Sequence, residues 1–130
     1  MGAAIECFQG AAAIVIPRSR FAPVKTTSDL LALASDAYEV TDDQRMVLAP
    51  ARKGIPPNVK LDGSYKFVDA LNELVPNGTP SLVGCDKLVI EGPVEFAEGV
   101  IFVGSVTVVN KASERKVLKA GTYRHKTIRL

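Results

Sequence analysis

Three basic side chains, Arg18, Arg20 and Lys25, lie close together in a stretch that Pro17 and Pro23 stiffen. The apolar run before them predicts a buried strand, and the sequence after them predicts the start of a helix. Crossings from a strand to a helix commonly bind anions. We therefore expect an anion-binding loop here. The alternative is a solvated basic loop whose arginines pair with acids elsewhere.

The neighbouring elements are expected to hold these cations in place. Residues 11–16 form the apolar run expected as a strand, and residues 2–8 are expected as a short helix packed on it. Pro23 fixes its own φ at about −65° and biases Ala22 toward extended backbone. Lys25 should therefore occupy a reproducible position.

A helix and a hairpin are expected next along the chain. Thr27 or Ser28 can cap the helix, and Asp29 in its first turn favours the positive helix end. Its buried side is expected to be formed by Leu30, Leu31 and Leu33. Residues 37–40 and 46–48, which flank a polar five-residue connection, predict a β-hairpin.

The segment Pro-Arg-Ser-Arg-Phe-Ala-Pro-Val-Lys-Thr-Thr-Ser-Asp-Leu-Leu, residues 17–31, resembles a segment of the eukaryotic-type UTP–glucose-1-phosphate uridylyltransferases. Residues 1–8, 33–38 and 81–110 resemble further parts of that family, whereas residues 50–80 match it weakly. The resemblance implies an α/β fold. It consists of the C-terminal edge of a Rossmann-like nucleotidyltransferase domain followed by a short left-handed parallel β-helix.

The resemblance also implies roles for the three cations. The family lysine that matches Lys25 reaches the phosphates in the active site, so Lys25 is expected to be catalytic. Arg18 and Arg20 are expected to bind substrate phosphate or to shape the loop. The implied partners are an upstream catalytic domain, UTP, glucose 1-phosphate and UDP-glucose. Mg²⁺ is expected to bind with the substrate in the complete enzyme, with no protein ligand from this chain.

The nucleotide-binding loop of that family has no counterpart in this sequence. The ten glycines are scattered, and none forms a cluster whose N–H groups could surround a triphosphate. We therefore expect a C-terminal fragment of a longer, truncated or split enzyme, with Met1 inside a domain, that is inactive by itself. The alternative is a non-catalytic structural or oligomerisation module.

Composition favours a folded, soluble, cytoplasmic chain. Hydrophobic residues make up 47% and charged residues 23%. The apolar runs are shorter than the roughly 18 residues that cross a bilayer, so no membrane partner is expected. Cys7 and Cys85 are expected to be reduced and buried, and His125 to lie at the surface, which supports neither a disulfide framework nor a zinc site.

The C-terminal residues 111–130 are strongly basic, with seven cations against the single acid Glu114. Such a patch attracts phosphates or nucleic acid. Tyr123 is its only large aromatic residue, so base stacking has little support. No nucleic-acid partner is therefore predicted.

Two apolar patterns describe the second half of the chain. Residues 65–75 predict a helix with one buried side, formed by Phe67, Val68, Leu71, Leu74 and Val75. After it, apolar residues recur every sixth position, at Leu82, Leu88, Val94, Val100 and Val106, and again two positions later at Ile90, Phe96, Phe102 and Val108. Glycines and other small residues separate them.

Hexads of this kind are typical of a left-handed parallel β-helix, and about two coils would fit. A solenoid so short needs its ends covered. The candidate covers are the helix at residues 65–75, the upstream domain, or a second copy of the chain in a homo-oligomer formed through the β-helix. A hexapeptide acyltransferase is disfavoured because His125 lies outside the repeat. The expected parts are residues 1–52 from the nucleotidyltransferase domain, residues 53–80 as a connector with a helix at about 65–75, and residues 81–130 as the β-helix.

Overall fold

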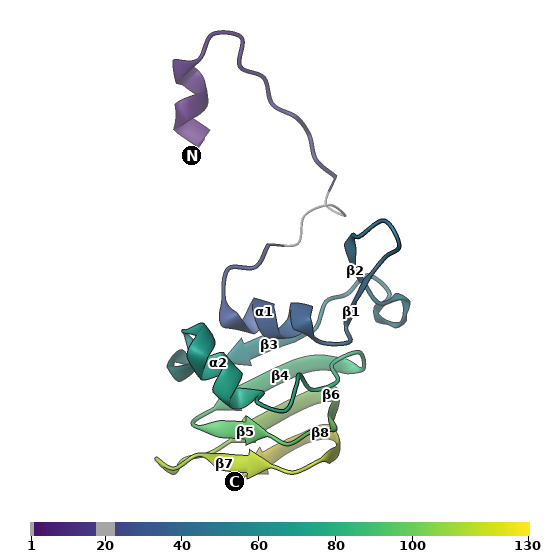
Figure 1. Cartoon of the computed structure of the whole chain (residues 1–130), viewed down its shortest axis with the longest axis vertical. Helices are drawn as coiled ribbons and strands as arrows, with labels where there is room; N and C mark the ends of the chain where they lie inside the picture. The colour runs from purple at the N-terminus through teal and green to yellow at the C-terminus, as the bar shows by residue number, and fades with distance from the viewer. Residues whose placement is uncertain (1, 18–22) are drawn as a thin grey trace.

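A computed structural model of the chain describes residues 2–17 and 23–130, and its folded part begins at the first α-helix (Figure 1). The chain starts with η1, a 3₁₀-helix at Gly2–Cys7, where we expected a short helix. Residues 11–17 form no strand, and Ile14 and Val15 are about nine-tenths exposed. The expectation of a buried strand at residues 11–16 was therefore wrong. A buried strand needs neighbours to pair with, and no described strand lies beside this segment.

Helix α1, Thr27–Ala34, has its N-cap one residue before the nearer of the two expected caps, Thr27. Thr26 is its N-cap, and its hydroxyl forms a reciprocal capping box with Asp29. Thr27 and Ser28 instead tie the helix to later segments, because the Thr27 hydroxyl donates to the Tyr65 carbonyl and the Ser28 hydroxyl accepts from the Leu61 N–H. Leu31 is buried as expected, while Leu30 and Leu33 are half-buried.

The expected hairpin is confirmed. Strands β1, Tyr38–Val40, and β2, Met46–Leu48, pair antiparallel, with Val40 opposite Met46. A short 3₁₀-helix, η3, follows at Pro50–Arg52.

Parallel strands make up the rest of the fold and stack below α1 (Figure 1). The larger sheet has four parallel strands in the order β3-β4-β6-β8, and the smaller sheet pairs β5 with β7, also in parallel. Their bounds are β3 Asn58–Leu61, β4 Cys85–Glu91, β5 Val94–Phe96, β6 Val100–Val109, β7 Lys116–Leu118 and β8 Gly121–Arg129. The chain is thus a mixed α/β protein with a parallel sheet.

The hexad positions form the core between these sheets. All nine apolar residues that the period singles out are buried, none more than 2% exposed, which confirms that part of the sequence interpretation. Phe96 and Phe102 meet edge to face, with their ring centroids 5.4 Å apart. Gly92 turns one corner with a φ of 79°, where a Cβ atom would lie 1.9 Å from the Asn110 carbonyl oxygen.

Helix α2, Val68–Leu74, is shorter than the helix expected at residues 65–75. Leu71 and Leu74 are buried, but Phe67 is 71% exposed and Val68 is 53% exposed, so the expected apolar side was only partly right. Phe67 is the extended residue before the helix, and helical periodicity therefore does not apply to it. Tyr65, in the 3₁₀-helix η4 at Gly63–Tyr65, is buried in its place.

The cysteines differ from each other in exposure. Cys85 is buried and unpaired, as expected, and burial raises the pKa of its thiol to about 11 despite the opposing charge of Arg52. Cys7 is exposed, so its expected burial was wrong. His125 is exposed, as expected. Within the described residues, no helix combines the length and apolarity needed to cross a membrane.

Candidate functional site

Lys25 lies two residues before α1, and Asp29 holds its backbone. The Lys25 N–H donates to Asp29 Oδ2 at 3.0 Å, and the same oxygen accepts from the N–H and the hydroxyl of Thr26, both at 2.9 Å. The Asp29 N–H donates to the Thr26 hydroxyl in return, at 3.2 Å. Four hydrogen bonds therefore fix where the Lys25 side chain leaves the backbone.

The charge of Asp29 strengthens this arrangement. Burial raises the pKa of Asp29, but the hydrogen bonds from Lys25 and Thr26 and the positive charge of Lys25 outweigh it. The pKa of Asp29 consequently lies below its ordinary value of 3.8. The carboxylate stays ionised near neutral pH, where it accepts these bonds most strongly.

The Lys25 side chain is exposed, and its ammonium forms no ion pair with a carboxylate of the described residues. Such an amine has a charge that is available to a ligand, and the geometry suits stabilisation of an anion. Arg18 and Arg20, the other two predicted site residues, lie outside the described residues. The structure therefore tests neither their position nor their contacts with Lys25.

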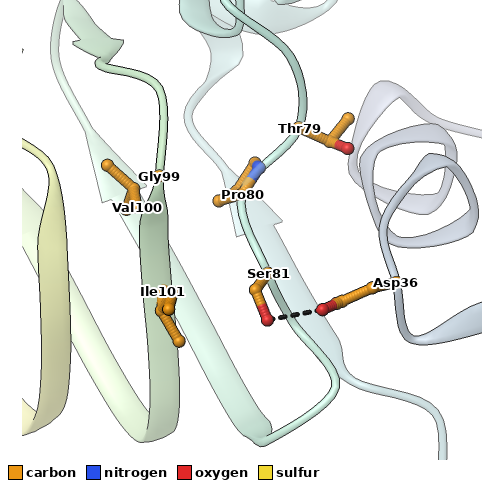
Figure 2. A pocket seen from close by; sticks show the side chains of 7 residues that line it. All are labelled: Asp36, Thr79, Pro80, Ser81, Gly99, Val100 and Ile101. Atoms are coloured by element: carbon orange, nitrogen blue, oxygen red, sulfur yellow. Dashed lines mark hydrogen bonds between the residues drawn. The ribbon is translucent and has the colours of Figure 1, made fainter.

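A shallow hollow of about 240 Å³ lies elsewhere, between the α1–β1 turn, the segment before β4 and the start of β6 (Figure 2). It is lined by Asp36, Thr79, Pro80, Ser81, Gly99, Val100 and Ile101. Lys25 is not among these residues, and none of them is basic. The hollow is therefore a poor phosphate site.

Asp36, at the wall of this hollow, is a residue that sequence reasoning missed. Its carboxylate accepts from the Ser81 hydroxyl at 2.5 Å (Figure 2). It also accepts from the N–H groups of Leu82 and Val83, at 2.7 and 2.9 Å. These bonds connect the turn after α1 to the segment that precedes β4. Because its partners lie more than 40 residues away in sequence, no local pattern predicts them.

Arg52 was missed as well. Its guanidinium is buried and donates to the carbonyl oxygens of Ile55, Val83 and Cys85, at 2.9, 3.2 and 2.6 Å. Asp36 and Arg52 thus bind backbone groups of the same turn, residues 81–85. Asp36 thereby adds to the bonds of Thr27 and Ser28 that attach α1 to later segments.

The fold and this site define a mixed α/β protein with parallel sheets, and comparison with known proteins assigns it to the nucleotidyltransferases. The family profile for UTP–glucose-1-phosphate uridylyltransferase matches residues 1–102. The chain belongs to the UTP–glucose-1-phosphate uridylyltransferase family, which confirms the resemblance found in the sequence.

Individual relatives agree with this assignment. The UTP–glucose-1-phosphate uridylyltransferase of Hordeum vulgare is 41% identical over 92% of this chain and 25% of that protein. The Saccharomyces cerevisiae relative is 42% identical over 83% of this chain and 21% of its own length. The chain thus spans about a quarter of the curated relatives that it matches.

Solved structures match the whole chain. A variant of the UDP-glucose pyrophosphorylase of Leishmania major in complex with UDP-glucose shares 47% identity, with a TM-score of 0.87 over 100% of this chain and 28% of that one. The UDP-glucose phosphorylase of Trypanosoma brucei also shares 47% identity, with a TM-score of 0.88 over 100% and 29% of the two chains.

Proposed function

We propose that this chain supplies one part of an enzyme that forms UDP-glucose and pyrophosphate from UTP and glucose 1-phosphate. Family membership and the likeness to a Leishmania major enzyme crystallised with UDP-glucose support this activity. The remaining three quarters of such an enzyme would provide the uridine and sugar sites.

In this proposal, Lys25 stabilises negative charge during the transfer. A phosphate oxygen of glucose 1-phosphate attacks the α-phosphorus of UTP, and the bond from that phosphorus to the bridging oxygen breaks, so that pyrophosphate leaves. The Lys25 ammonium would contact the α-phosphate or the departing pyrophosphate, which needs no proton transfer. Its backbone anchor at Asp29, together with its exposed amine, is the observation that carries the assignment. Arg18 and Arg20 would bind phosphate or shape the loop.

Magnesium is given no protein ligand in this proposal. Among the described residues there is no group of three or more His, Cys, Asp or Glu side chains that could hold a metal ion. The ion that the family implies would enter with the substrate phosphates, and none of the steps assigned to this chain depends on it.

We also propose that the parallel strands form a short left-handed β-helix from residue 81 onward. Leu88 lies opposite Val106, eighteen positions later, and Val94 lies opposite Lys116, twenty-two positions later. These repeats are close to the eighteen or so residues of a coil of three hexads. Residues 1–52 would belong to the catalytic domain and residues 53–80 to the connector, although β3 of the connector already pairs with β4.

The isolated chain is proposed to be inactive, because its sequence contains no glycine-rich loop to bind a triphosphate. A chimera provides the active background for testing Lys25. In it, residues 1–130 replace the matching segment of the Hordeum vulgare relative, and pyrophosphate release is measured with UTP and glucose 1-phosphate. The isolated chain, assayed in parallel, should release none.

Lys25→Ala in the chimera should lower kcat by about ten- to a hundredfold, because a charge-assisted hydrogen bond contributes about 1.5–3 kcal/mol. Lys25→Arg should also be impaired, since a planar guanidinium does not replace a compact ammonium. Lys60→Ala, which removes an exposed lysine from β3, is the control. An unchanged kcat for Lys25→Ala would remove Lys25 from the mechanism.

A further inference from the structure

The last coil, residues 116–130, is basic, whereas residues 81–115 before it contain more acids than cations. It contains β7, the turn that follows and β8, which lie together at the end of the stack opposite α1 (Figure 1). Its sequence contains no aspartate or glutamate. Its five cations are all exposed: Lys116, Lys119, Arg124, Lys126 and Arg129.

Two of these lysines occupy positions that are apolar in the preceding coil. Lys116 lies opposite Val94, and Lys126 lies opposite Val106, both of which are buried. The strand register therefore places one lysine on the core side of each sheet, at the end of the stack. Inward-pointing charged residues discourage an edge strand from pairing with an uncharged apolar segment, so a segment that pairs here must itself supply negative charge.

The row of aromatic rings formed by Phe96, Phe102 and Tyr123 also ends at a lysine. Phe102 packs against Tyr123, with 6.0 Å between their ring centroids. The ammonium nitrogen Nζ of Lys126 lies over the Tyr123 ring, 4.9 Å from its centroid. This distance is typical of a cation–π contact. The last ring of the core is therefore covered by an ammonium group, and it offers little free surface for stacking a nucleic-acid base.

The backbone of β8 provides the second element of a binding surface. This nine-residue strand pairs with β6, and within the described part of the chain no strand lies on its other side. Its outer N–H and C=O groups can pair with an added extended segment, which is a common way to bind peptides. The three cations of the strand, Arg124, Lys126 and Arg129, would then select the charge of that segment.

We infer that the last coil is a docking surface for an extended, acidic polypeptide segment, which adds as a strand along β8. Charge complementarity favours this partner, since five exposed cations have no acid among them. A second copy of the chain, considered above as an oligomer partner, would bring two such cationic faces together. This inference is independent of the role of Lys25.

The test measures binding of the 130-residue chain to a nine-residue peptide of alternating glutamate and valine, the length of β8. A peptide with the same number of glutamates and proline in place of valine keeps the charge but lacks half of the backbone donors. The double variant Arg124→Glu/Arg129→Glu reverses two cations of the surface. Lys60→Glu/Lys87→Glu, which reverses two exposed lysines of β3 and β4, is the matched control. Circular dichroism establishes that each variant is folded.

The Glu–Val peptide should bind the chain, and added salt should weaken this binding. The proline peptide should bind the unaltered chain about tenfold or more weakly. The Arg124→Glu/Arg129→Glu variant should bind the Glu–Val peptide with a similar loss of affinity. The control variant should bind like the unaltered chain. Equal affinity for the two peptides would overturn strand addition, and equal affinity of the two variants would overturn the surface itself. Tighter binding of single-stranded nucleic acid or anionic vesicles, or concentration-dependent self-association in sedimentation, would replace the acidic polypeptide as the partner.

Discussion

Asp36 is expected to be a principal link between the N-terminal segment and the coils, and replacing it by alanine tests this directly. The change removes an acceptor of three hydrogen bonds, two of which satisfy the backbone N–H groups of Leu82 and Val83. Bonds to a charged group contribute about 1.5–3 kcal/mol each when they are buried. Because Asp36 is exposed, we discount their sum to about 2 kcal/mol in the free energy of unfolding.

The assay is urea unfolding of the 130-residue chain, followed by circular dichroism. Asp36→Ala should lower the midpoint with little change in the m-value, and a thermal scan should show a Tm lower by about 6–10 °C. Asp36→Asn keeps one acceptor oxygen and should fall in between. Ser81→Ala completes a double-mutant cycle, in which a coupling of about 0.5 kcal/mol or more is expected.

Asp42→Ala is the control for charge, because Asp42 is an exposed acid of the hairpin turn. Its effect should stay within about 0.5 kcal/mol. The reasoning would be refuted if Asp36→Ala cost no more than Asp42→Ala, since the three bonds would then contribute nothing to holding α1 on the coils.

Two further predictions concern the core and the anchor of Lys25. Phe102→Ala should lower the free energy of unfolding by about 3–5 kcal/mol, because the ring is fully buried between Phe96 and Tyr123; a loss below about 1 kcal/mol in urea unfolding would contradict this packing. The folded pKa of Asp29 lies below its ordinary value of 3.8, so its stabilisation is complete well above that value and is lost as the pH falls through the lowered pKa. Asp29→Asn should therefore be less stable than the unaltered chain at pH 7, with a gap that narrows below pH 3.8; a gap independent of pH would show that the charge does not act there.

The burial pattern of the parallel strands was the most predictable part of the fold. The period of six is visible because the residues that point into the core recur at every sixth position. Leu82, Leu88 and Val94 show this spacing, as do the later apolar positions, and all of them are buried. The hairpin was predictable because its two strands and its turn are adjacent in sequence. Such local signals do not depend on the rest of the molecule.

Elements that depend on distant partners were less predictable. The run at residues 11–16 has the composition of a buried strand, but composition does not supply the neighbouring strands that burial requires. Asp36 and Arg52 bind backbone groups that lie 31 to 47 positions away in sequence, and no local pattern encodes such bonds. The helix cap was off by one residue because three hydroxyl residues occur in succession. The spacing of Thr26 and Asp29, which is that of a capping box, would have identified it.

The central claim, that the Lys25 amine contacts substrate phosphate, is tested most directly by chemical protection. In the active chimera, lysines are acetylated briefly with and without saturating UDP-glucose, and labelling of each amine is followed by mass spectrometry. Bound UDP-glucose should slow acetylation of Lys25 several-fold and leave that of the exposed Lys60 unchanged. Equal labelling of Lys25 with and without the nucleotide sugar would contradict the account.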